Sequence, residues 1–108
     1  MWFLHINEIF DYIRKQLNDK NTSIREIIVF GSVARGNFTP ESDLDLLVIA
    51  DDVQEAKHLF GRIADDLYIK YLVPMTVIYV HTNVLKGNKL SSFLKTALNE
   101  GKVIWRRE

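Results

Sequence analysis

The chain has 108 residues, no cysteine, 47% hydrophobic and 26% charged residues, and a formal net charge of zero. This length and balance predict a single domain over residues 1–108 with a modest core, and they exclude a disordered chain, a fibre and a disulfide scaffold. The zero net charge gives no direct evidence for nucleic-acid binding. No apolar run approaches the roughly 20 residues of a membrane span, so we expect no membrane insertion. The absence of cysteine makes a cytoplasmic location the expectation.

The first half of the chain predicts one helix followed by two strands. Apolar residues at helical spacing predict an amphipathic helix from Ile6 to Leu17. Apolar runs predict strands over 24–30 and 44–50, with a small-residue turn and a polar loop between them. Because the run 44–50 is apolar on both alternating faces, we expect an interior strand that helices cover on both sides.

The second half predicts two more helices and two more strands. Asp52 and Glu55 resemble a capping box, in which the Asp52 carboxylate accepts a backbone N–H, so a helix is expected to follow as far as Tyr71. The remaining predicted elements are a strand over 75–80, a polar loop over 82–89, a helix over 90–98 that stops at Gly101, and a short strand over 103–105. This order predicts an α/β (α+β) fold, a small mixed β-sheet flanked by helices.

Two carboxylates stand at the start of the run 44–50. Asp43 and Asp45 are two residues apart, so in a strand both side chains point to the same face. Two adjacent negative charges beside apolar residues are costly unless a cation neutralises them. Mg²⁺ favours one or two carboxylates together with waters and substrate phosphate oxygens, which this pair can supply. Taken alone, the pair also fits a loop end, where aspartate is common.

A turn of small residues, Gly31-Ser32-Val33-Ala34-Arg35-Gly36, closes the preceding strand. Gly31 lets a phosphate approach the backbone, Ser32 adds a hydroxyl donor, and the Arg35 guanidinium matches phosphate oxygens. The chain has neither a P-loop nor a Gly-x-Gly-x-x-Gly pattern. Since a glycine-serine pair is common in turns, the prediction depends on its spacing from the carboxylates.

The combined pattern is Gly-Ser-x10-Asp-x-Asp, with ten residues between Ser32 and Asp43. A turn that holds a triphosphate, beside a strand end that holds Mg²⁺, is the equipment of nucleotidyl transfer. Residues 28–49 closely resemble the signature of the minimal nucleotidyltransferases (MNT family), within the DNA polymerase β superfamily, and residues 93–104 also look like small members of that family. The resemblance implies a polymerase β palm-like fold. It also implies site roles: phosphate binding by Gly31 and Ser32, and magnesium binding by the catalytic residues Asp43 and Asp45.

One position departs from the family pattern. The superfamily carries a third acidic residue on the following strand, where this chain has Thr76. Threonine is neither a general base at neutral pH nor a strong magnesium ligand. Another acid or a partner then completes the site, or the reaction is slow, or the chain only binds nucleotide. Asp65 and Asp66 are expected on the solvated face of the preceding helix.

The leading hypothesis is therefore a Mg²⁺-dependent nucleotidyltransferase that moves NMP, from ATP in the favoured case, to a hydroxyl acceptor. The family resemblance suggests the antitoxin of a toxin–antitoxin pair, with a small helical HEPN-type partner whose tyrosine accepts AMP. The alternative hypothesis is a catalytically weak nucleotide-binding module that neutralises its partner by forming a complex. The nucleotide base, the acceptor and the choice between homo- and hetero-oligomer stay open at this stage.

Overall fold

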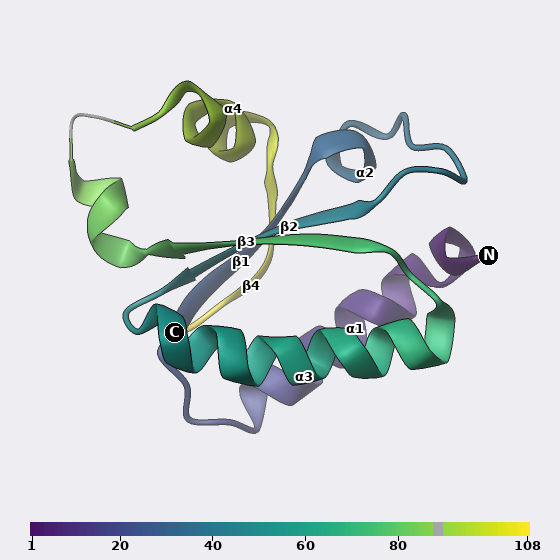
Figure 1. Ribbon diagram of the computed structural model, residues 1–108, viewed down its shortest axis with the longest axis horizontal. Helices are drawn as coiled ribbons and strands as arrows, with labels where there is room; N and C mark the ends of the chain where they lie inside the picture. Colours follow the sequence, from purple (N-terminus) through teal and green to yellow (C-terminus); the bar gives the residue numbers. More distant parts are fainter. Residues whose placement is uncertain (88–89) are drawn as a thin grey trace.

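The computed structural model describes residues 1–87 and 90–108. Figure 1 shows a four-stranded sheet between two layers of helices, with α1 and α3 on one side and α2 and α4 on the other. In chain order the elements are the 3-10 helix η1 (Trp2–His5), α1 (Ile6–Asn18), β1 (Ile24–Phe30), α2 (Gly31–Arg35), β2 (Leu44–Ala50), α3 (Val53–Tyr71), β3 (Met75–His81), the 3-10 helix η2 (Thr82–Lys86), α4 (Ser92–Glu100) and β4 (Lys102–Arg106). The predicted mixed sheet flanked by helices is confirmed.

One predicted segment differs from the structure. The polar loop expected over 82–89 begins instead with the helix η2, which the His81 side chain caps by accepting a hydrogen bond from the Asn83 backbone N–H. Residues 88–89 of that predicted loop lie outside the described residues.

The strand order across the sheet is β3-β2-β1-β4. β1 pairs antiparallel with β2 and with β4, while β2 and β3 run parallel. The prediction of an interior strand over 44–50 is confirmed, because β2 lies between two strands and every residue in it except Asp45 is buried. β3 is almost as apolar in sequence but forms a sheet edge, and most of it is half-buried.

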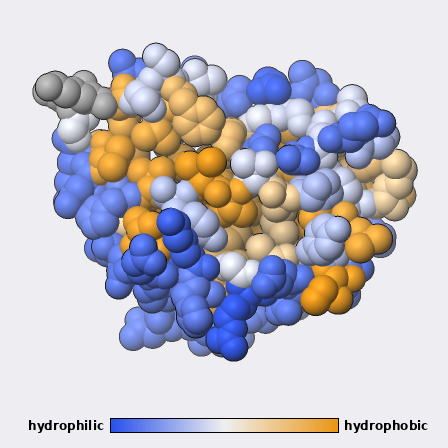
Figure 2. All heavy atoms as spheres, viewed as in Figure 1, coloured by the Kyte–Doolittle hydropathy of each residue, from blue (hydrophilic) through white to orange (hydrophobic). Residues whose placement is uncertain are grey.

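Alternating strand residues divide the core between the two faces of the sheet. Leu46 and Val48 pack with residues of α1 and α3, such as Ile13 and Phe60, in the larger cluster. The smaller cluster contains the residues that point the other way; its buried members are Ile28, Phe30, Leu47, Ile49, Val80 and Ala97. The helices cover this second face less completely, and Figure 2 shows hydrophobic surface between α4 and α3 on the side toward the viewer.

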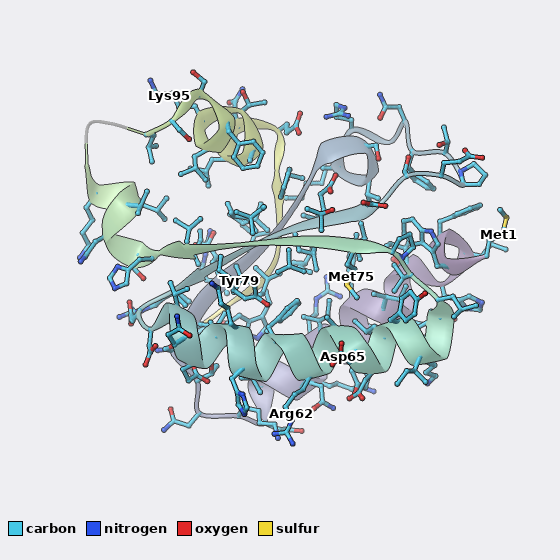
Figure 3. All side chains as sticks on the ribbon, in the orientation of Figure 1. Met1, Arg62, Asp65, Met75, Tyr79 and Lys95 are labelled. Carbon is cyan, nitrogen blue, oxygen red and sulfur yellow. The ribbon has the colours of Figure 1, made fainter. Side chains whose placement is uncertain are left out.

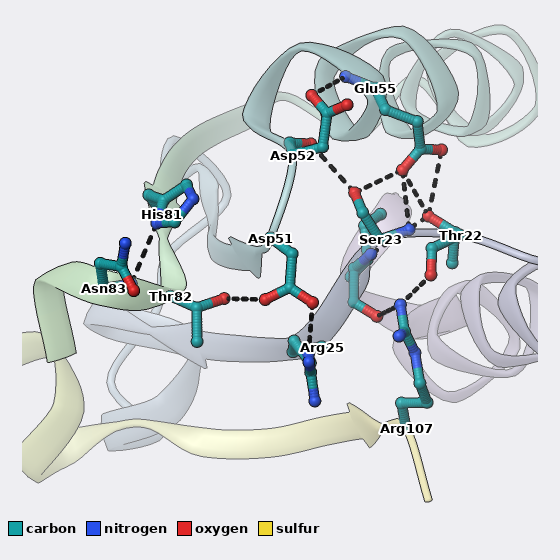
Figure 4. Close-up of polar contacts among 11 residues, drawn as sticks. Thr22, Ser23, Arg25, Asp51, Asp52, Glu55, His81, Thr82, Asn83 and Arg107 are labelled. Atoms are coloured by element: carbon teal, nitrogen blue, oxygen red, sulfur yellow. Dashed lines mark hydrogen bonds and ion pairs between the residues drawn. The ribbon is translucent and has the colours of Figure 1, made fainter. Parts of the chain in front are cut away.

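A polar network holds the end of the sheet where β1 begins and β2 ends (Figure 4). Asp52 caps α3 by accepting a hydrogen bond from the Glu55 backbone N–H, as predicted. The Glu55 carboxylate does not complete the capping box; instead it accepts hydrogen bonds from the hydroxyls of Thr22 and Ser23 and from the Ser23 backbone N–H. The Arg107 guanidinium donates to the Thr22 and Ile24 carbonyls. The network thus joins α3, β1 and the C-terminal segment.

The end of α4 packs closely on β1. Gly101 stops the helix as predicted, but its backbone is extended, with φ of −72°, and not left-handed. A Cβ at this position would lie 2.5 Å from Ile28 Cγ2 and 3.2 Å from the Val29 carbonyl oxygen. Glycine is therefore required here by the close approach of the helix end to the strand.

Among the described residues, no helix combines the length and the apolar composition that crossing a membrane requires.

Candidate active site

The antiparallel pairing of β1 and β2 brings the two halves of the sequence pattern together. Phe30, the last residue of β1, pairs with Asp45 on β2. Gly31 and Ser32 begin α2 immediately after Phe30, so the turn lies beside the carboxylate. Asp43 is exposed just before β2, and Asp45 is half-buried. The structure therefore places the predicted phosphate-binding turn next to both predicted metal ligands.

Gly31 is the point of closest approach between the turn and the strand. Its φ is +71°, a left-handed conformation that L side chains rarely adopt. A Cβ built on Gly31 would lie 2.2 Å from Asp45 Oδ2, well inside van der Waals contact. Only glycine allows the turn and the carboxylate to occupy these positions together.

The electrostatics of the site favour a bound cation. Burial raises the pKa of Asp45, and the neighbouring charge of Asp43 raises it further. The Arg35 guanidinium partly opposes this rise, while the Glu100 carboxylate adds to it. A divalent cation would remove the repulsion between the two carboxylates, and its preferred ligand set includes carboxylates, waters and phosphate oxygens. The residues present therefore fit a magnesium ion.

Thr76 lies on β3, the strand on which the family resemblance expects the third acidic residue. β3 pairs Thr76 with Asp45, and the Thr76 hydroxyl donates a hydrogen bond of 3.1 Å to Asp43 Oδ2. The side chain is therefore adjacent to both carboxylates but contributes a donor in place of an acid. In the part of the chain that the structure describes, no group of three or more Asp, Glu, His or Cys side chains is arranged to hold a metal ion.

Asp65 and Asp66 do not replace the missing acid. Both are exposed on α3, as predicted, and Asp66 accepts a hydrogen bond from the Tyr12 hydroxyl of α1. Figure 3 shows Asp65 on the helix, whereas Met75 marks the start of β3.

Ser32 and Arg35 both belong to the short helix that follows β1. Ser32 is half-buried at its second position, and Arg35 is exposed at its last. Gly36 ends the helix in a left-handed conformation and donates its backbone N–H to the Val33 carbonyl. The turn therefore presents one hydroxyl and one guanidinium near the carboxylates.

One residue at the site was not singled out from the sequence. Glu100, at the end of α4, accepts a hydrogen bond of 3.0 Å from the Gly31 backbone N–H. The same carboxylate pairs with the Arg35 guanidinium at 3.1 Å. Nearly 70 residues of sequence separate Glu100 from the turn. The resemblance covered Glu100 and Gly101 as sequence, but no spacing rule connects a helix end to a turn on another strand.

The family model of the nucleotidyltransferase domain matches residues 10–104 of the chain. The protein adenylyltransferase MntA of Thermococcus cleftensis is 35% identical over 95 residues, which are 88% of each chain. MJ0604 of Methanocaldococcus jannaschii, also named as a protein adenylyltransferase, is 38% identical over 84 residues, 76% of this chain and 79% of that protein. These matches confirm the predicted family.

Solved structures agree with the fold. A toxin–antitoxin complex crystallised with AMP-PNP superposes with a TM-score of 0.64 at 22% identity, covering 92% of this chain and 74% of that one. The complex of a tri-AMPylated Shewanella oneidensis HEPN toxin with its MNT antitoxin gives 0.57 at 20% identity, covering 99% and 74%. At such identities these structures support the architecture alone.

Proposed function

The chain belongs to the nucleotidyltransferase domain family, and from this premise we propose that it transfers AMP from ATP to a hydroxyl of a partner protein. The proposed metal ligands and catalytic residues are Asp43 and Asp45, and the proposed nucleotide-binding residues are Gly31, Ser32 and Arg35. The observation that carries the proposal is the contact between the Gly31 turn and the Asp45 carboxylate, which a single Cβ would prevent.

The three turn residues have different parts in binding the phosphates. The Gly31 backbone N–H already donates to Glu100, so Gly31 contributes mainly the close approach of the turn to Asp45. The Ser32 hydroxyl and the free N–H groups of Arg35 supply donors to phosphate oxygens. A guanidinium suits this purpose because it presents five donors in a fixed plane.

In the reaction, the acceptor oxygen attacks the α-phosphorus of ATP. The new bond joins that oxygen to the α-phosphorus, the bond to the β-phosphate oxygen breaks, and pyrophosphate leaves. Asp43 and Asp45 would hold Mg²⁺, which would supply positive charge to balance the charge that develops on the phosphates and the leaving group. The proton of the acceptor hydroxyl passes to solvent, since the Thr76 hydroxyl cannot accept it at neutral pH.

The proposed partner is a small helical HEPN-type protein with a tyrosine acceptor. The support is the naming of the relatives as protein adenylyltransferases and the AMPylated toxin seen with a structurally similar antitoxin. A second function has its own motive, because a threonine stands beside both carboxylates where the superfamily has an acid. In that case the chain binds nucleotide with little or no catalysis, and it neutralises its partner by forming a complex.

The test is transfer of label from α-labelled ATP to the HEPN-type partner in the presence of Mg²⁺. Wild type is compared with Asp43→Ala/Asp45→Ala, and with Asp65→Ala/Asp66→Ala as a control that removes two exposed acids elsewhere. We expect label transfer by wild type and by the control variant only. If the partner is neutralised equally by all three proteins and none transfers label, the binding module is correct and the enzyme is not.

A further inference from the structure

Glu100 makes two contacts that meet at the proposed phosphate-binding turn. One oxygen of its carboxylate accepts the Gly31 backbone N–H at 3.0 Å and the Arg35 Nη1 at 3.1 Å. The second oxygen lies 3.2 Å from the same Arg35 nitrogen. The Glu100 side chain is 22% exposed, against 48% for Arg35, so the acid is the more buried member of the pair.

The helix that carries Glu100 is itself fixed at both ends. Ser91 caps its start by accepting a hydrogen bond from the Leu94 backbone N–H. At its end, the absence of a side chain at Gly101 lets the chain lie against Ile28 and Val29 of β1. The Glu100 carboxylate therefore comes from a helix with contacts at both ends, and it reaches the turn that follows the same strand.

We propose that Glu100 is a positioning residue of the nucleotide site: it holds the Gly31 peptide beside Asp45 and orients the Arg35 guanidinium toward the ATP phosphates. This inference rests on the proposed function. The carboxylate occupies one nitrogen of the guanidinium, which leaves the N–H groups of the other two nitrogens for phosphate oxygens. By accepting the Gly31 N–H, it also holds the left-handed peptide that keeps the turn close to Asp45.

The same chain contains an ion pair that serves as a matched control. Arg106 pairs with Glu26 at 3.2 Å, and the Glu26 side chain is 23% exposed, almost the same as Glu100. This pair joins β4 to β1 at the opposite end of the sheet from Gly31. Partly exposed ion pairs contribute little to stability, so removing either acid leaves the chain folded.

The experiment measures the affinity of the full chain for AMP-PNP and Mg²⁺ by calorimetry, in wild type, Glu100→Ala, Glu100→Gln and Glu26→Ala. We expect the Kd to rise about tenfold in Glu100→Ala, because the charge-assisted hydrogen bond that orients Arg35 is lost. Glu100→Gln keeps a neutral acceptor for the Gly31 N–H, so its Kd is expected between those of Glu100→Ala and wild type. Glu26→Ala is expected to bind as wild type does.

A second measurement reports on the turn without nucleotide. The Gly31 amide resonance should shift, and its hydrogen exchange should quicken, in Glu100→Ala but not in Glu26→Ala. A wild-type chain that binds no AMP-PNP overturns both the proposed function and this inference. Wild-type binding with an unchanged or lower Kd in Glu100→Ala overturns the inference alone, as does an unchanged Gly31 amide.

Discussion

The two ends of the β1–β2 pair hold their carboxylates in opposite ways. At the end where β1 begins, burial alone would raise the pKa of Glu55. Hydrogen bonds from Ser23 and Thr22 outweigh that effect, and the pKa of Glu55 is lowered. At the end where β1 finishes, burial raises the pKa of Asp45, and the charge of Asp43 raises it further. The protein's own hydrogen bonds stabilise the charged form of Glu55, whereas the charged form of Asp45 is destabilised by burial and by Asp43.

The two kinds of acid differ in what stabilises their negative charge. A carboxylate that receives several donors stabilises the folded chain by itself and needs nothing else. Two neighbouring carboxylates that repel each other, with one hydroxyl donor from Thr76, would be stabilised by a bound cation. The raised pKa of Asp45 is therefore consistent with the proposed cation site.

The largest effect is expected from Gly31→Ala. The new Cβ lies at 2.2 Å from Asp45 Oδ2, so the carboxylate must move by an ångström or more. We expect AMP transfer to fall roughly a hundredfold, the effect of displacing a reacting or metal-binding group by about 1 Å. Gly36→Ala is the control, because φ there is +78° but nothing lies within 4 Å of the added Cβ.

Both glycine variants should lose about 1–2 kcal/mol of stability from the left-handed backbone. Urea unfolding measures that shared cost, and label transfer measures the difference between them. Equal activity of the two variants would show that contact with Asp45 has no functional importance.

A smaller effect, of opposite sign, is expected from Thr76→Asp. This change restores an acid beside Asp43 and Asp45, in the register position that pairs with Asp45. A general base contributes about 10²–10⁴-fold to proton transfer, so we expect the rate of AMP transfer to rise about tenfold or more. The measurement is single-turnover transfer of label at saturating ATP and Mg²⁺.

The other end of the sheet supplies the control for that variant. Thr82 donates a hydrogen bond of 2.7 Å to Asp51, which is the same kind of pair as Thr76 with Asp43. Thr82→Asp introduces the same repulsion between carboxylates but should leave the transfer rate unchanged. A rate that does not rise in Thr76→Asp means that the missing third acid is not what limits the reaction.

Local pattern was sufficient to predict most of this architecture. The strand over 44–50, the Asp52 cap and the side-by-side placement of Asp43 and Asp45 follow from alternation, capping chemistry and the period of a strand. The position of Thr76 followed from the resemblance, since the family pattern gave the register of the next strand. Each of these features depends on residues close in sequence or on a known motif.

The contacts that the sequence did not predict join distant segments. Glu55 suggested a reciprocal cap on its own helix, yet its carboxylate contacts Thr22 and Ser23, more than 30 residues earlier. Glu100 reaches Gly31 across the sheet. Which donors a carboxylate contacts depends on how distant segments pack together, and no periodic pattern in the sequence predicts those contacts.

The smallest effect expected is a difference in the pH dependence of stability between Glu55→Gln and Asp45→Asn. The folded-state pKa of Glu55 is lowered, so its stabilisation is present above its ordinary value of 4.5 and is lost as pH falls through the folded pKa. At pH 7 Glu55→Gln should therefore be less stable than wild type by about 1 kcal/mol, and the difference should shrink in acid.

Asp45 should behave in the opposite way, in the absence of Mg²⁺. Its folded-state pKa is raised, so the favourable protonated form is fully present below its ordinary value of 3.8, and that contribution is lost as pH rises through the folded pKa. Asp45→Asn stays neutral and should be more stable than wild type at pH 7, with the difference again shrinking in acid. Urea unfolding at a series of pH values measures both, and Gln54→Ala, an exposed change beside Glu55, gives a pH-independent reference. A change in stability at pH 7 with the same sign in both variants would contradict the contrast between the two ends of the sheet. The charged form stabilises the fold at Glu55 and destabilises it at Asp45, so neutralising the two side chains must have opposite effects.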